Sequence, residues 1–348
     1  MPNDIYLHTG KERDMFKRTM AAVLALGLLL AGGCARAATE KPLSRQGFML
    51  NTAVSIALYD LRDEAILDGA FALCEEYEQL LSRTIETSDV YRINAAQGEP
   101  VRVSAPTLEA LQAALDYAEL SGGAFDPTIE PLTTLWDIMS DSPRVPEGDD
   151  IAAALSRVDW TQVRIEGDAV SLAPGMGLDL GGIAKGYIAD RLREYLRAQG
   201  VGSALINLGG NVLTLGGKPD GSEFVVGIQK PFGERQSDLI GAYRIKDMSV
   251  VTSGVYERYF EQDGVLYHHI LDTETGYPVD NDVFSVTIIS PGSTEGDALS
   301  TICFALGVDS GLELIESLDG IEAVYCLSDG SLVFSSGAGA GWLYPDEL

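Results

Sequence analysis

The chain has 348 residues, 46% of them apolar, which is enough to bury one large core or two smaller ones. Its 52 Asp and Glu outnumber its 24 Lys and Arg, so the net charge is -28. An acidic chain with no Lys/Arg-rich stripe repels nucleic-acid phosphates, so we expect no DNA or RNA partner. An anionic small molecule would need a metal ion or locally placed donors to offset the repulsion.

The N-terminus has the pattern of a secretion signal. Two basic residues precede an uncharged apolar run over residues 21–31, which is short for a permanent membrane span. The run ends in L-A-G-G-C, and Cys34 after small residues resembles a bacterial lipobox, whose cysteine is lipidated. We expect residues 1–34 to be a signal peptide with a lipobox, with 1–14 as an upstream extension. A plain signal peptide with an incidental cysteine is the alternative.

This signal predicts a location in the cell envelope. The protein would be lipid-anchored through Cys34 at the extracytoplasmic face of a bacterial membrane. Residues 35–45 would form a polar tether, and residues 46–348 the folded domain.

Four later segments have apolar residues at helical spacing. The first begins near Ile66, and the second follows Ser104 and stops at Gly122-Gly123. The third runs over about 183–199 and the fourth over about 295–307. Apolar or alternating runs predict strands at 204–208, 224–228, 284–290, 321–327 and 332–335.

The order of these elements indicates the fold class. Strands and helices mix without regular βαβ alternation, which favours an α+β fold with mixed, largely antiparallel sheets flanked by helices. The stretch 132–168 is polar, contains proline and has little periodicity, so we expect a surface excursion there.

Two segments have residue types that suit an anion and a cation. In D-L-G-G-I-A-K-G, residues 179–186, glycines lead into a helix and Lys185 adds a positive charge, as in anion sites. A tight strand-to-helix connection is the alternative. Asp297 and Thr301 are four residues apart on a predicted helix, and their oxygens suit Mg²⁺. The alternative is an ordinary helix start, with Asp297 near the positive end of the helix dipole. On this pair alone, we favour the helix start over a metal site.

Three further segments are less specific by themselves. I-N-L-G-G-N at 206–211 suits a flat heterocycle or a hairpin turn, and G-A-F-D-P-T at 123–128 indicates a turn. His268 and His269 are the histidines that follow the signal segment. Histidine titrates near neutral pH, so they are candidates for proton transfer, although imidazoles that bond backbone groups are equally expected.

Eight motifs together resemble the ApbE family, the FAD:protein FMN transferases, and they occur in the family's order. They are F-M-L-N-T (48–52), G-A-F-D-P-T-I-E-P-L (123–132), D-L-G-G-I-A-K-G (179–186), I-N-L-G-G-N (206–211), V-G-I-Q-K-P (226–231), T-S-G-V-Y-E-R-Y-F (252–260), H-H-I-L-D-T-E-T-G-Y-P (268–278) and D-A-L-S-T (297–301). The resemblance implies a two-lobed ApbE-like fold for residues 46–348.

The resemblance also implies an activity and a set of site residues. The family binds FAD with Mg²⁺, places FMN on a threonine hydroxyl of an acceptor protein and releases AMP. Acceptor domains would include subunits of membrane redox complexes. Carried over by position, the Mg²⁺ ligands are Asp297, Thr301 and the Gly182 carbonyl. The residues that contact FAD are Met49, Ala124, Phe125, Asp126, Asp179, Lys185 and Ile270.

The catalytic base is expected at His268 or His269, of which at most one would serve because neighbouring strand residues face opposite sides. Two departures from the family pattern occur. Ser82-Arg83-Thr84 lacks the family's frequent aromatic residue, and Thr273 replaces a common proline, which we expect only to loosen a turn.

Two rival functions share most of these residues. One is a Mg²⁺-dependent FAD pyrophosphatase that yields FMN and AMP. The other is a non-catalytic FAD-binding lipoprotein. Such a protein cleaves no bond, so it would not require a metal ion at the diphosphate of FAD.

Overall fold

The computed structural model describes residues 41–233 and 238–348. The predicted signal peptide, Cys34 and most of the tether lie outside these residues. Strand β1 begins at Leu43 and pairs with β2. The tether prediction is therefore wrong for residues 43–45, because they are part of a hairpin.

The described part of the chain has seven helices and sixteen strands. The helices are α2 (Glu64–Leu81), α3 (Asp89–Ala95), α4 (Ala105–Leu120), α5 (Glu130–Trp136), α6 (Gly148–Leu155), α7 (Ala184–Ala198) and α8 (Ser293–Glu316). The strands are β1 (Leu43–Met49), β2 (Thr52–Leu58), β3 (Val101–Arg102), β4 (Arg164–Glu166), β5 (Ala169–Ser171), β6 (Ala204–Leu208), β7 (Asn211–Leu215), β8 (Phe224–Gln229), β9 (Leu239–Ile245), β10 (Ser249–Gly254), β11 (Tyr259–Gln262), β12 (Val265–His268), β13 (Val283–Ser290), β14 (Glu322–Leu327), β15 (Leu332–Phe334) and β16 (Trp342–Leu343).

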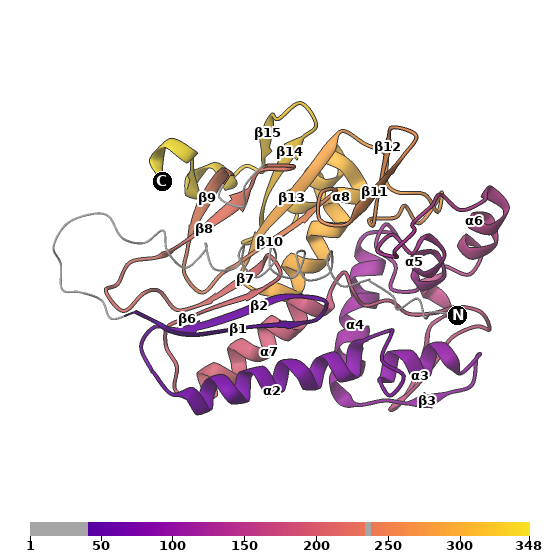
Figure 1. Cartoon of the computed structure of the whole chain (residues 1–348), viewed down its shortest axis with the longest axis horizontal. Coiled ribbons are helices and arrows are strands. Elements are labelled where there is room, and N and C mark those ends of the chain that lie inside the picture. The colour runs from indigo at the N-terminus through magenta and orange to yellow at the C-terminus, as the bar shows by residue number, and fades with distance from the viewer. Residues whose placement is uncertain (1–40, 234–237) are drawn as a thin grey trace, which may run out of the picture.

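One eight-stranded sheet organises the molecule, in the order β1-β2-β6-β7-β10-β13-β14-β15. Neighbouring strands in it are antiparallel, as are those of the smaller sheets β16-β9-β8, β3-β5-β4 and β11-β12. Helices α2 and α7 lie together along the large sheet, and α3, α5 and α6 gather at the far end from β8 and β9 (Figure 1). The predicted α+β fold with largely antiparallel sheets is confirmed.

The predicted helices and strands agree closely with these bounds. Strand β6 covers Ala204–Leu208 as predicted, and α7 differs from its predicted range by one residue at each end. At Gly307 the backbone of α8 leaves helical geometry, with φ 74°, but a second helical segment continues to Glu316. The break was predicted, and the continuation was not.

The prediction of a surface excursion at 132–168 is wrong. Helices α5 and α6 pack around a small core of their own, to which Trp136, Ile151, Phe260 and Leu271 belong. The Trp136 indole N–H donates a hydrogen bond to the carbonyl of Gly276 at 2.8 Å. The partners come from a distant segment, so local periodicity does not reveal this core.

The main core lies between the large sheet and its helices, and α8 runs through it. In the described residues, α8 is the one helix long and apolar enough to suit a membrane span as well. It packs against β10, β13 and α7, as a core helix does.

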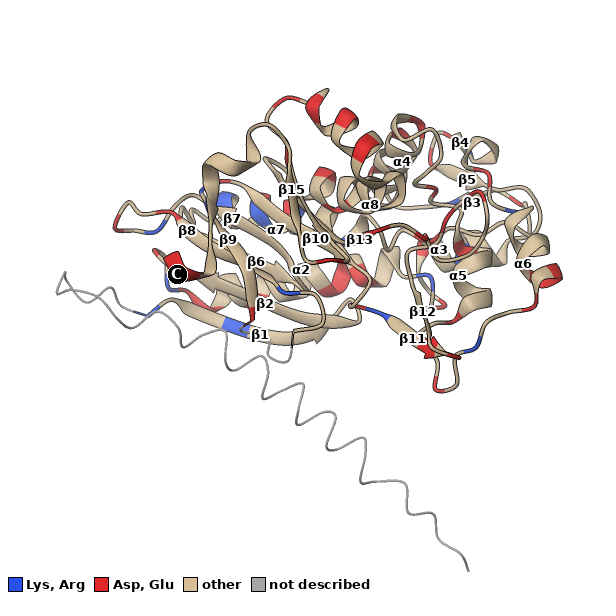
Figure 2. Ribbon diagram, turned by 90° about the horizontal axis from the view of Figure 1, so that it is seen from above, with Lys and Arg blue, Asp and Glu red and all other residues tan. Residues whose placement is uncertain are grey.

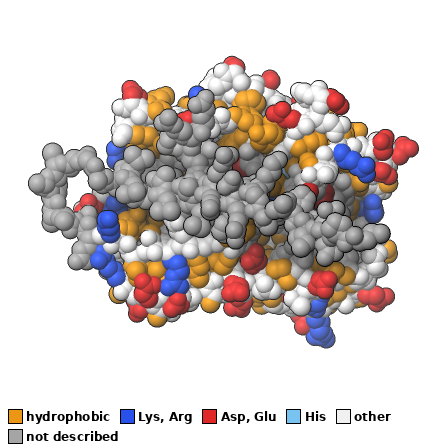
Figure 3. Space-filling model, in the orientation of Figure 1, with side chains coloured by type: hydrophobic (Ala, Val, Ile, Leu, Met, Phe, Trp, Pro, Cys, Tyr) orange, Lys and Arg blue, Asp and Glu red, His pale blue; other side chains and the backbone are white. Residues whose placement is uncertain are grey.

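Charge is distributed without a basic stripe on the faces drawn. Acidic residues are spread along the ribbon, with Lys and Arg between them (Figure 2). The face in Figure 3 also shows both charges interspersed with hydrophobic side chains.

Candidate active site

The first turns of α7 and α8 meet, and we call this contact the α7–α8 junction. The Gly186 N–H donates to Asp297 Oδ2 at 2.8 Å, and Lys185 Nζ lies 3.6 Å from Asp297 Oδ1. A Cβ at Gly186 would lie 2.2 Å from the carbonyl oxygen of Ser293, so only glycine lets the helices approach this closely. The junction therefore holds a buried carboxylate beside a lysine.

The other two predicted metal ligands lie at the same junction. Thr301 is one turn after Asp297 on α8, so both side chains project from one face. A Cβ at Gly182 would lie 3.7 Å from Thr301 Oγ1 and 2.9 Å from a ring carbon of Phe125. Thr301 Oγ1 also lies 3.5 Å from Ser253 Oγ. The structure thus brings Gly182, Asp297 and Thr301 together.

The chemistry of these groups fits Mg²⁺. A carboxylate, a hydroxyl and a backbone carbonyl are all hard oxygen donors, which Mg²⁺ prefers. No group of three or more His, Cys, Asp or Glu suited to a metal occurs within residues 41–233 and 238–348. A site with so few protein ligands leaves coordination positions for water and a substrate phosphate.

Asp179 anchors the loop before α7. Its Oδ1 accepts the Gly181 N–H at 2.9 Å, and its Oδ2 accepts from Thr133 Oγ1 at 3.0 Å. Arg83 Nε also lies 3.1 Å from Asp179 Oδ2. Arg83 lies in the segment that lacks the family's aromatic residue. It therefore forms an ion pair with Asp179, which is predicted to contact FAD.

Asp126 uses both carboxylate oxygens within the protein. Its Oδ1 accepts from the N–H and hydroxyl of Thr128, and its Oδ2 accepts the Trp160 N–H at 3.0 Å. Burial raises the pKa of Asp126, against the lowering effect of these hydrogen bonds. The Asp126 side chain thus stabilises the turn. A ligand in the pocket would then contact the backbone of Ala124–Asp126 and not this carboxylate.

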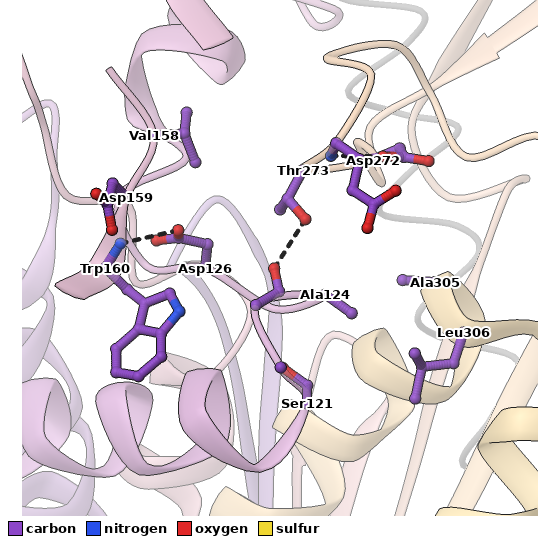
Figure 4. Close-up of a pocket in the computed structure, with 13 residues that line it drawn as sticks. Ser121, Ala124, Asp126, Val158, Asp159, Trp160, Asp272, Thr273, Ala305 and Leu306 are labelled. Carbon is purple, nitrogen blue, oxygen red and sulfur yellow. Dashed lines mark hydrogen bonds between the residues drawn. The ribbon is translucent and has the colours of Figure 1, made fainter. Parts of the chain in front are cut away.

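A pocket of about 480 Å³ opens beside this turn (Figure 4). On α8, Ala305 lines the pocket one turn after Thr301, so the pocket adjoins the junction. Its lining is Ser121, Gly122, Gly123, Ala124, Asp126, Val158, Asp159, Trp160, Asp272, Thr273, Glu274, Ala305 and Leu306.

His268 uses both ring nitrogens in hydrogen bonds to the backbone. Nε2 lies 3.0 Å from the Val279 carbonyl, which makes it the donor, and Nδ1 accepts the Ile270 N–H at 3.3 Å. The ring is 5% exposed, and burial lowers its pKa. His268 therefore has no lone pair left to take a proton.

His269 has one ring nitrogen to spare. Its Nδ1 lies 3.3 Å from the carbonyl of Arg258, so Nδ1–H donates and Nε2 keeps its lone pair. Burial, followed by the charges of Arg258, His268 and Lys185, lowers its pKa to about 3. The ring is thus neutral at pH 7, and Lys185 of the junction is among the charges that lower its pKa.

Of the last two predicted FAD contacts, Ile270 belongs to the main core and Met49 packs against it. Met49 ends β1 and is partly buried. Ile270 is 5% exposed, and its carbonyl accepts the Val279 N–H at 3.0 Å.

Comparison with known proteins identifies the family and the fold. The ApbE family model matches residues 50–325, which is most of the chain. The chain belongs to the ApbE family. It is 43% identical over 297 residues to a FAD:protein FMN transferase of Klebsiella pneumoniae, covering 84% of this chain and 92% of that protein. A FAD:protein FMN transferase of Treponema pallidum is 38% identical, covering 90% of this chain and 92% of that protein.

Solved structures agree with this assignment. The ApbE protein of Thermotoga maritima has a TM-score of 0.80 and 34% identity, covering 86% of this chain and 99% of that chain. The apo flavinyl transferase ApbE of Pseudomonas stutzeri has a TM-score of 0.77 and 30% identity, covering 87% of this chain and 97% of that chain. The prediction of an ApbE-family flavin transferase is confirmed.

The structure adds residues to which the sequence assigned no role. Arg258 orients His269 through its carbonyl, and Ser253 contacts Thr301. Glu257 directly precedes Arg258 and is exposed. All three residues belong to the family motif at 252–260. That motif was the feature of the sequence that could have identified them as site residues.

Proposed function

We propose that this ApbE-family flavin transferase uses Mg²⁺ to transfer the FMN moiety of FAD to a threonine hydroxyl of an acceptor protein, with release of AMP. The observation that carries the proposal is the α7–α8 junction. Asp297, Thr301 and the Gly182 carbonyl would hold the ion there, with Lys185 beside them. When bound, Mg²⁺ polarises the phosphoryl group as a Lewis acid.

The distribution of charge supports an orientation for FAD. The negative diphosphate fits the junction, where Lys185 provides positive charge. The pocket is lined by Asp126, Asp159, Asp272 and Glu274, so it suits an uncharged ring system and disfavours phosphate. We infer that one ring system of FAD enters the pocket while the diphosphate stays at the junction.

We propose His269 as the base. A threonine hydroxyl has a pKa far above neutral and needs a proton acceptor as it attacks. The hydroxyl oxygen bonds to the phosphorus nearer riboflavin, its proton passes to Nε2 of His269, and the bond to the AMP oxygen breaks. The Arg258 carbonyl keeps His269 in the tautomer that this step needs.

One reaction separates the proposal from its rivals. The protein is incubated with FAD, Mg²⁺ and an acceptor domain, and AMP release is followed together with the acceptor's mass. If the protein is a transferase, one FMN should be added to the acceptor for each AMP released. An acceptor whose threonine is replaced by valine should gain no FMN. AMP release with an unmodified acceptor would show a pyrophosphatase, and FAD binding without AMP would show a non-catalytic lipoprotein.

We also propose that the enzyme is lipid-anchored through Cys34 at the extracytoplasmic face of a bacterial membrane. Its acceptors would then be domains of membrane redox complexes that face the same compartment. The apolar run ending in L-A-G-G-C supports this. Cys34→Ser should abolish lipid labelling, whereas Ala35→Ser should not. Unchanged membrane attachment in Cys34→Ser would contradict the anchor.

A further inference from the structure

Two tight turns form facing walls of the pocket. The first turn, at Ser121–Asp126, is held internally because Ser121 Oγ accepts the Phe125 N–H at 3.1 Å. The second, at Asp272–Gly276, is held by Asp272 Oδ1, which accepts the N–H groups of Glu274 and Thr275. Each turn is therefore a rigid local unit, and the width of the pocket depends on how the two are joined.

A side-chain hydroxyl joins them. Thr273 Oγ1 donates a hydrogen bond to the carbonyl oxygen of Gly123 at 2.8 Å (Figure 4). Gly123 has φ +93°, a left-handed conformation that suits glycine. Thr273 was expected only to loosen a turn, and that expectation is wrong because its hydroxyl makes this bond. The proline that is common at this position has no such donor.

The bond lies between two segments predicted to contact FAD. Gly123 immediately precedes Ala124, and Thr273 is three residues after Ile270. A change in spacing between the turns would therefore displace contacts on both sides of a bound ring. A displacement of this kind weakens ground-state binding more than it changes the chemistry at the junction.

We propose that Thr273 is a positioning residue that sets the width of the ring-binding pocket, and thereby the enzyme's affinity for FAD. The proposal rests on the proposed function in one respect, namely that a ring system of FAD occupies this pocket. Thr273 itself takes no part in proton transfer or phosphoryl transfer.

Two substitutions isolate the hydroxyl. Thr273→Val keeps the branched shape and removes the donor, whereas Thr273→Ser keeps the donor and removes a methyl group. Ser203→Ala is a matched control, because Ser203 Oγ donates to the Gly217 carbonyl at 2.7 Å and Ser203 does not line the pocket.

The decisive measurement is FAD binding by fluorescence titration in the presence of chelator, where no turnover occurs. We expect Thr273→Val to bind FAD about 3- to 10-fold more weakly, the size of one lost hydrogen bond. Thr273→Ser should bind like the parental protein, and Ser203→Ala should lower the melting temperature without changing affinity. In Mg²⁺-supported transfer, Thr273→Val should raise KM by a similar factor and leave kcat within about twofold.

Parental FAD affinity in Thr273→Val would overturn the inference, as would equal weakening in Ser203→Ala or failure of Thr273→Ser to restore binding. These failures are distinct from failure of the proposed function. If the parental protein binds FAD but releases no AMP, transfer is refuted while the Thr273 comparison still gives its result. If the parental protein does not bind FAD, both proposals are overturned.

Discussion

The α7–α8 junction and the pocket lie side by side along α8, yet they differ in packing and charge. At the junction, Asp297 is 3% exposed and Lys185 lies beside it. The pocket is open and lined by acidic residues, with Trp160 and Leu306 among its walls. The difference suits a chain of net charge -28 that has to bind an anionic dinucleotide, as the proposed function requires. In the proposed binding mode, Lys185 and a metal ion would offset the diphosphate charge at the junction, and the acidic pocket would receive an uncharged ring.

Removal of the junction's carboxylate should have the largest effect. We expect Asp297→Ala to reduce Mg²⁺-dependent AMP release on the order of a thousandfold or more, because the polarising ion loses its anionic ligand. Asp309→Ala, an exposed carboxylate on the same helix, should retain the parental rate. Full activity of Asp297→Ala, or of the parental enzyme in excess chelator, would contradict a metal at the junction.

The two neighbouring histidines should respond in opposite ways. His269→Asn should slow acceptor flavinylation about a hundredfold by removing the base, with little change in FAD affinity. His268→Asn should leave the rate nearly unchanged and lower the free energy of unfolding by about 1–2 kcal/mol, because it disturbs buried hydrogen bonds. In-gel flavin fluorescence and chemical denaturation measure these effects. If both variants flavinylate at the parental rate, the base lies elsewhere, with Asp179 or Asp272 as the next candidates.

Close packing at the junction can be tested through Gly186. A Cβ there would overlap Ser293 and Asp297, so Gly186→Ala should lower the free energy of unfolding by about 1–3 kcal/mol. Gly339→Ala meets no atom within 4 Å and should cost less than about 0.5 kcal/mol. Equal stability of the two variants in urea denaturation would show that the junction is loosely packed.

The depressed pKa of His269 predicts a pH effect on stability. Its pKa falls from 6.5 to about 3 on folding, so its contribution is fully present above pH 6.5 and is lost as pH falls toward 3. Relative to His269→Asn, the parental protein should lose about 1–2 kcal/mol of unfolding free energy between pH 7 and pH 4.5, allowing for solvent screening. A difference that stays constant with pH would show that His269 titrates normally.

The sequence predicted those parts of the fold whose signals are local. The helical spacing and the glycine stops gave α4 and α7 nearly to the residue, and a β-branched run gave β6. The core around Trp136 escaped prediction because its partners, such as Phe260 and Leu271, are distant in sequence. Short helices that depend on such contacts have weak patterns of their own.

The candidate site likewise has features that local sequence signals predicted and features that depend on tertiary contacts. The spacing of Asp297 and Thr301 placed both on one helix face, but a tertiary contact brings Gly182 to them. The near-neutral pKa of histidine made both His268 and His269 candidates for the base. Only their hydrogen bonds separate the saturated His268 from His269 with its free nitrogen. Likewise, nothing local to Thr273 indicates that its hydroxyl reaches Gly123.

Calorimetric titration of FAD with and without Mg²⁺, in the parental protein and in Asp297→Ala, tests most directly whether the diphosphate binds at the junction. Mg²⁺ should tighten FAD binding about tenfold or more in the parental protein, because Asp297 would help to hold the ion and the ion would offset the charge of the diphosphate. In Asp297→Ala the same addition should change affinity less than about twofold. An equal gain in both proteins would place the metal and the diphosphate away from the junction.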